Sequence, residues 1–177
     1  MKQLHYFILI LAFGISTQGF GQEAVKPRPS PTAIVTMKYE NSYVKITYCQ
    51  PHKKDREIFG SLVPYGKVWR TGANEATEIT VTQDITIGGN PLSAGTYSIF
   101  TIPDVEKWTI IINGGLGLWG DYNYSEELDV MRFEVPVSKT EKIWEAFTIA
   151  FEQKNNLADL VMLWDDTRVS IPLIFNE

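Results

Sequence analysis

The chain has 177 residues, of which 44% are hydrophobic and 12% aromatic, and its 21 acidic and 16 basic side chains give a formal net charge of −5. A single cysteine cannot close an internal disulfide, and one cysteine with two histidines supplies too few ligands for a zinc module. The acidic balance argues against a general nucleic-acid-binding protein, and the apolar content argues against a disordered chain.

The first residues predict a cleaved signal peptide over residues 1–21. Lys2 supplies a positive start, and the apolar run at 6–15 has about half the length that a membrane-spanning helix needs. Gly19 and Gly21 are small residues suited to a cleavage site before Gln22, and Cys49 lies too far along the chain to carry a lipid anchor. We therefore expect a secreted or periplasmic protein that is not a lipoprotein and has no membrane span. Its mature chain keeps 15 basic and 21 acidic side chains, a net charge of −6.

Residues 22–32 are expected to form a proline-rich linker. Pro27, Pro29 and Pro31 fix the backbone φ angle and lack N–H donors. The segment is predicted to be an extended tether with nothing to pack against. The remaining residues, 33–177, are predicted to form one domain.

Alternation of apolar and polar residues predicts that this domain is built of strands. The pattern of period two is typical of half-buried strands. Residues Asp165 and Asp166 are expected to form the turn of a final hairpin, and Ser138–Glu141 has the spacing of a helix cap, with room for a turn or two of helix. About eight to ten short antiparallel strands predict an all-β fold, a single antiparallel β-sandwich with a small β-barrel as the alternative. The two strands joined at Pro103 are 96–102 and 107–113. The alternating runs are 44–48, 79–81, 131–137, 147–151, 160–164 and 169–173.

The stretch at 51–77 interrupts this pattern and predicts one long ordered loop. Loops of this length are usually functional or disordered, but apolar side chains such as Ile58 and Trp69 provide enough surface to hold this one in place. The simplest interpretation is an ordered crossover that closes one end of the sandwich.

The charge of this loop indicates a further role. Five basic and two acidic side chains between His52 and Gly72 give a local charge of +3, which leaves −9 on the rest of the mature chain. A positive island on an acidic protein attracts anions. Arg70 is the main candidate, because a guanidinium held by its neighbour Trp69 can bind a carboxylate or phosphate through two parallel hydrogen bonds. The structural alternative is that Arg70 pairs with Glu75 or Glu78 and locks the loop.

We accordingly predict a non-enzymatic binding or accessory module whose ligand is a small anionic molecule or a glycan. Its site is assigned to the loop and to one aromatic residue further along the chain. The predicted roles are aromatic walls for Trp69 and Tyr65, cationic clamps for Arg70 and Arg56, polar contacts for Asn74 and Thr77, and an aromatic platform for Trp119.

Catalytic residues, a metal and a cofactor are not predicted. Cys49 and His52 are spaced as C-x-x-H, but a strand leading into Pro51 spreads them apart, and no second histidine remains after leader removal. The phosphate, dinucleotide and nucleophile-elbow motifs are absent from the sequence. Two alternatives stay open: a structural adaptor that binds partners through sheet edges, and an envelope hydrolase. The carboxylates available to the hydrolase are Asp55, Glu57, Glu75 and Glu78.

Several runs of the sequence resemble domain-of-unknown-function family 2911. The most specific run is residues 68–77 (VWRTGANEAT), and the resemblance covers essentially the whole chain after Ser30. It implies an envelope protein of Bacteroidetes-type bacteria with a leader and one β-rich domain. It brings no reaction, cofactor or catalytic residue. The other matching runs are residues 48–51, 56–60, 62–66, 92–97 and 100–103.

Overall fold

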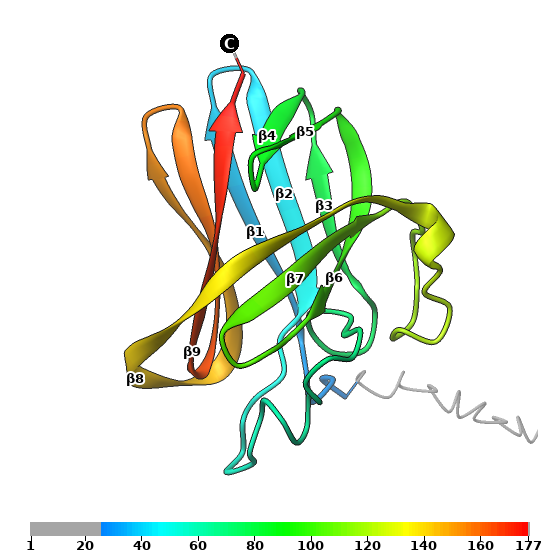
Figure 1. Cartoon of the computed structure of the whole chain (residues 1–177), viewed down its shortest axis with the longest axis vertical. Coiled ribbons are helices and arrows are strands. Elements are labelled where there is room, and N and C mark those ends of the chain that lie inside the picture. The colour runs from blue at the N-terminus through cyan, green and yellow to red at the C-terminus, as the bar shows by residue number, and fades with distance from the viewer. Residues whose placement is uncertain (1–25, 177) are drawn as a thin grey trace, which may run out of the picture.

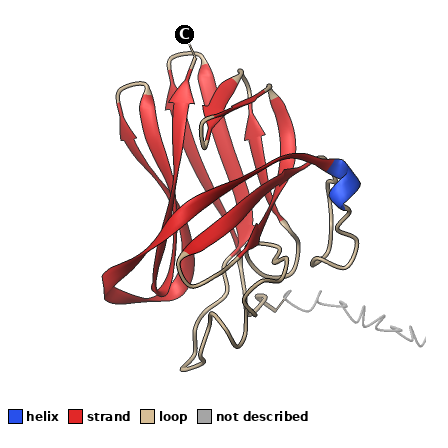
Figure 2. Ribbon diagram, viewed as in Figure 1, coloured by secondary structure: helices blue, strands red, loops and turns tan. Residues whose placement is uncertain are grey.

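The computed structural model describes residues 26–176, which form a nine-stranded antiparallel sheet (Figures 1 and 2). The predicted signal peptide and the first part of the predicted linker lie outside these residues. A single turn of 3₁₀ helix, η1 (Glu126–Leu128), precedes the eighth strand. Between residues 26 and 176, no helix is long and apolar enough to cross a membrane. The strands are β1 (Thr32–Tyr39), β2 (Ser42–Cys49), β3 (Thr77–Val81), β4 (Ile85–Ile87), β5 (Asn90–Leu92), β6 (Gly95–Ile102), β7 (Lys107–Asn113), β8 (Asp129–Lys154) and β9 (Leu157–Phe175).

The sheet is bent along its longest strand, so that its two parts face each other. The strand order is β1-β2-β3-β6-β7-β8-β9-β4-β5. The first part of β8 pairs with β7 and its last part pairs with β9, so β8 belongs to both layers (Figure 1). The all-β sandwich prediction is confirmed. Among the described strands β1 and β5 are the two ends of the order, and the sheet does not close into a barrel.

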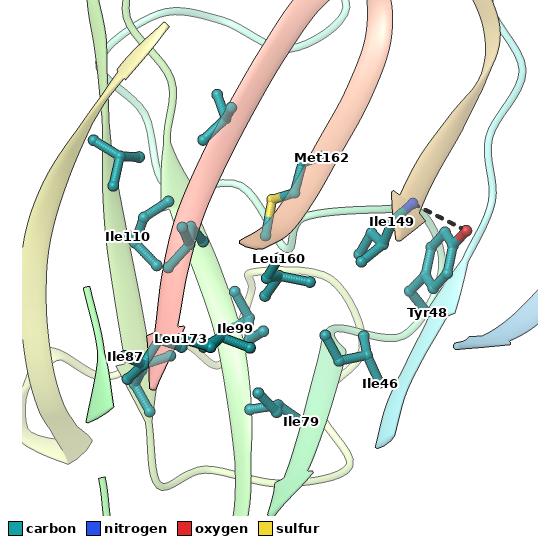
Figure 3. Close-up of a cluster of buried hydrophobic side chains, with 14 of the residues drawn as sticks. Ile46, Tyr48, Ile79, Ile87, Ile99, Ile110, Ile149, Leu160, Met162 and Leu173 are labelled. Atoms are coloured by element: carbon teal, nitrogen blue, oxygen red, sulfur yellow. Dashed lines mark hydrogen bonds between the residues drawn. The ribbon is translucent and has the colours of Figure 1, made fainter. Parts of the chain in front are cut away.

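One hydrophobic core joins the two layers (Figure 3). The alternating positions Ile46 and Ile79 are fully buried on one layer, and Leu160 is fully buried on the other. Each such side chain contributes about 1.5–3 kcal/mol when it leaves water. The backbone N–H of Ile149 in β8 donates to the phenol oxygen of Tyr48 in β2 at 3.2 Å, which ties the layers together through a buried hydrogen bond.

One local prediction is wrong, and one local spacing has no counterpart in the structure. Asp165 and Asp166 do not form a hairpin turn but lie inside β9, where Asp165 has a φ of +55° and the strand bends. Ser138–Glu141 is not helical, because it lies within β8 at the start of a stretch where the pairing with β9 shifts register. In both places the pairing of two long strands outweighs the local turn and cap preferences.

The 51–77 segment is an ordered loop, as predicted. It projects from the end of the sheet that lies away from the C-terminus (Figure 1). Isolated bridges hold it to the sheet: His52 pairs with Ala146 of β8, and Trp69 pairs with Thr101 of β6. The loop is therefore fixed to both layers of the sandwich.

The described part of the linker does not lie free, contrary to the prediction. Arg28 bonds to Glu75 of the loop at 2.6 Å, and the backbone oxygen of Ser30 accepts a hydrogen bond from Asn74. The guanidinium of Arg28 also lies 5.8 Å from the centre of the Trp119 ring. Proline excludes regular structure here but does not prevent docking through the other side chains.

Candidate functional site

Trp69 fixes the backbone from which Arg70 projects. Its N–H donates to the Thr101 carbonyl at 2.7 Å, and the Thr101 N–H donates back at 2.9 Å. Its indole N–H donates to the carbonyl of Gly72 at 3.0 Å, and its ring stacks on Trp164 with a centroid distance of 6.0 Å. The side chain is only 7% exposed. Trp69 is therefore an anchor of the loop.

The residues after Arg70 are held as firmly. The hydroxyl of buried Thr71 bonds to the Thr101 hydroxyl at 3.1 Å, and the hydroxyl of Thr77 donates to the Thr71 carbonyl at 2.6 Å. The Thr77 N–H donates to the carbonyl of Arg70 at 3.1 Å. The backbone of Arg70 is thus fixed on both sides, so the point from which its side chain extends is fixed as well.

The guanidinium of Arg70 has no partner among the described residues. Its Nε is buried without a hydrogen bond, and no ion pair is formed. The alternative pairing with Glu75 or Glu78 is absent, because Glu75 binds Arg28 and Glu78 accepts a hydrogen bond from the Gly117 N–H at 2.8 Å. A buried donor left unbonded costs about 1–3 kcal/mol, and more when the group is charged. Arg70 therefore holds unused hydrogen-bonding capacity.

This side chain lines a hollow of about 190 Å³, which we call the arginine pocket. Arg56 lies beside it, with its guanidinium bonded to the carbonyl oxygens of His52 and Lys53, so its position is fixed while its charge is not neutralised. Of the described residues, no aspartate or glutamate lines the pocket, so two positive charges face it. Its apolar walls include Pro51, Leu62, Trp69 and Trp164.

The structure brings together Arg56, Trp69 and Arg70 of the predicted site residues, and the other four lie elsewhere. The ring of Tyr65 covers Gly60, where a Cβ atom would lie 2.8 Å from it. Asn74 binds Ser30, and Thr77 is committed to Thr71. Trp119 is 53% exposed and contacts Arg28. None of these four lines the arginine pocket.

Two walls of the pocket could not be predicted from local sequence. Trp164 lies on β9, and its alternating position indicates only that it is buried, as it is at 2% exposure. Ser30 lies in the linker. Both reach the pocket through long-range packing that leaves no local pattern.

A second hollow of about 330 Å³, the glutamate pocket, is lined by Cys49, Glu75 and Glu78. The thiol of Cys49 is buried and donates to Glu75 at 3.3 Å. Hydrogen bonding from Arg28 holds the pKa of the Glu75 carboxyl below its usual value. His52 does not join Cys49 here, and in the described part of the chain no group of histidine, cysteine, aspartate and glutamate side chains is arranged to hold a metal ion.

The fold and the pocket together define an all-β sandwich domain with a small cationic pocket at its loop end. The chain belongs to the family described as protein of unknown function (DUF2911), whose model matches residues 30–173. Comparisons with curated proteins and with solved structures find no significant match. The family match covers the whole pocket.

Proposed function

We propose that this protein is a secreted or periplasmic binding or accessory module, without enzymatic activity, that holds a small anionic or sugar-like ligand in the arginine pocket. The observation that carries the proposal is the Arg70 guanidinium, which lines the pocket on a fixed backbone with a buried Nε that has no partner. The terminal nitrogens of the same group also lack a partner among the described residues, and a partly desolvated guanidinium binds an external anion through strong, charge-assisted hydrogen bonds.

The alternative of a hydrolase draws on loop carboxylates, and the structure gives it less support. A general acid needs a carboxyl with a raised pKa. Arg28 lowers the pKa of Glu75 instead. Asp55 and Glu57 are exposed on the loop and line neither of the two pockets described above.

Thermal unfolding with a panel of small anions and acidic sugars tests the proposal. A ligand that binds only the folded state raises the midpoint temperature with the logarithm of its concentration. Arg70→Ala is expected to abolish this stabilisation and to leave the midpoint without ligand unchanged or slightly higher. Lys67→Ala is the matched control, because it removes one positive charge from an exposed residue of the same loop. Equal stabilisation of both variants by every anion would refute the proposed site.

The location is tested separately. Mass spectrometry of the protein recovered from its native envelope or medium is expected to show a chain that begins near Gln22. A full-length chain recovered from the cytosol would contradict this part of the proposal.

A further inference from the structure

The arginine pocket also restricts what its ligand can be, an inference that rests on the proposed function. We propose that the ligand is a carboxylate carried on a small apolar body, and that Arg70 is the residue that selects it.

The hydrogen-bond donors of the pocket are few. The indole N–H of Trp69 is committed to the Gly72 carbonyl at 3.0 Å, and that of Trp164 to the Glu145 carbonyl at 3.2 Å. Arg56 already uses Nε and one terminal nitrogen on backbone carbonyls. The terminal nitrogens of Arg70, which make no hydrogen bond to the described residues, are therefore the main free donors of the pocket, beside the Ser30 hydroxyl and the remaining terminal nitrogen of Arg56. The Nε of Arg70 is buried behind them.

A carboxylate matches that donor set. Its two oxygens meet the two parallel N–H groups of one guanidinium edge, and the nearby charge of Arg56 adds attraction. A phosphate has four oxygens where a carboxylate has two, and a sugar ring carries a hydroxyl on nearly every carbon, so both place more polar atoms against the apolar part of the lining. Polar atoms left without partners in such a site weaken binding by their desolvation cost.

The walls away from the two arginines favour a ligand with a small apolar part. Pro51, Leu62, Trp69 and Trp164 supply apolar surface there, which makes up the smaller part of the exposed lining. The hollow of about 190 Å³ is partly open to solvent, so it accepts a small ligand or the end of a longer one. A small aromatic or branched aliphatic acid is a suitable probe. Two sources supply the chemistry: a free acid, and the C-terminal residue of a peptide with an apolar side chain.

Isothermal titration of the full mature chain at constant ionic strength tests the inference. Benzoate and 3-methylbutanoate represent free acids, and the peptide Ala-Ala-Leu represents a C-terminus. Benzamide and Ala-Ala-Leu amide are the uncharged counterparts, and inorganic phosphate and galacturonate are the competing ligand classes. We expect at least one free acid or the free peptide to bind, and both amides and phosphate to bind at least about tenfold more weakly. Whichever of the acid and the peptide binds more tightly identifies the source.

Variants separate the possible outcomes. Arg70→Ala is expected to abolish carboxylate binding, and Arg70→Lys to weaken it because an ammonium cannot form the paired hydrogen bonds. Lys67→Ala should bind as the unchanged protein does, and urea unfolding confirms that each variant is folded. Phosphate binding more tightly than every carboxylate, still dependent on Arg70, would overturn the carboxylate inference and support the binding function. Galacturonate binding more tightly than benzoate, 3-methylbutanoate and Ala-Ala-Leu would overturn the apolar body in the same way. No Arg70-dependent binding of any probe would overturn both.

Discussion

Gly72 lies where two stretches of backbone pass very close to each other beside the arginine pocket. A Cβ atom at this position would lie 2.9 Å from the carbonyl oxygen of Cys49. Backbone cannot move aside as a flexible side chain can. Glycine at 72 is therefore a packing requirement.

Gly72→Ala is expected to lower the free energy of unfolding by about 1–3 kcal/mol, because the loop must shift to relieve the contact. Urea denaturation measures the loss. Gly114→Ala is the control, since a Cβ there meets only the Leu128 carbonyl at an ordinary 3.5 Å. Equal losses in the two variants would contradict the close approach at 72.

The role of Arg70 shows how far single residues can be predicted. Its position beside Trp69 in a basic loop indicated an anion site, and the structure places it on a pocket. Its lack of a partner could not be predicted, because it depends on Arg28 binding Glu75 across 47 positions of the chain. Asn74 and Thr77 have suitable chemistry, but Asn74 is bonded to Ser30 of the linker and Thr77 to Thr71 of the loop. Sequence shows which residues can bind a ligand but not which are already occupied.

At the scale of elements, an ion pair connects the start of the loop to the bend in β9. Lys53 bonds to Asp165 at 2.6 Å and to the Arg56 carbonyl at 2.9 Å. Both charged side chains are only 21% exposed, whereas the pair of Lys107 and Glu134 is more than half exposed. Screening by water weakens the exposed pair much more than the sheltered one.

Lys53→Met is therefore expected to destabilise the protein by about 1–3 kcal/mol, because it leaves Asp165 without its partner. Lys107→Met should cost less than about 1 kcal/mol. Chemical denaturation of the two variants gives the comparison, and both substitutions keep an apolar stem of similar length. Equal losses of unfolding free energy in Lys107→Met and Lys53→Met would contradict a larger contribution from the sheltered pair.

The strands were largely predictable, and their lengths were not. Alternation identified the buried faces of β2 and β3, whose buried positions alternate. β6 and β7 were located as the two strands joined at Pro103, and both bury consecutive residues because Phe100 and Ile111 belong to a second hydrophobic cluster. Alternation divided β8 and β9 into shorter strands, because both run through irregular stretches where the side chains change face. The bend at Asp165 resembles a turn in sequence, since aspartate suits a positive φ in either setting.

At the scale of the whole molecule, acid is expected to weaken the fold through several surface carboxylates. Hydrogen bonds from Arg28, Arg168 and Lys139 lower the pKa values of Glu75, Glu152 and Asp166, respectively. A carboxyl with a lower pKa in the folded than in the unfolded protein stabilises the fold above its unfolded pKa. That stability is lost as the pH falls through the folded pKa.

Urea midpoints measured between pH 7 and pH 2 should therefore decrease toward acid. Glu152→Gln should flatten the decrease, because the glutamine does not titrate. Exposed Glu127 forms no ion pair with another residue of 26–176, so Glu127→Gln is a control variant that should leave the slope unchanged. An unchanged slope in Glu152→Gln would contradict the contribution of its pair with Arg168.

Alkali acts in the opposite direction through Tyr124. Burial, together with a 2.8 Å hydrogen bond to Asp129, raises the pKa of Tyr124 to about 12. Because the unfolded phenol loses its proton near pH 10, stability is expected to fall as the pH rises from about 10 to about 12. Tyr124→Phe should remove this part of the decline in unfolding experiments. Absorbance titration of the folded protein should lose a tyrosine that ionises near pH 12 in the same variant.

The walls of the arginine pocket come from both halves of the bent sheet. Trp164 belongs to β9, while Trp69 and Arg70 are joined to β6 through Thr101. A ligand bound between them would contact both halves of the sheet at once. Separating the two halves would require the ligand to dissociate first, so the protection of β9 amide hydrogens from exchange should increase with the occupancy of the pocket.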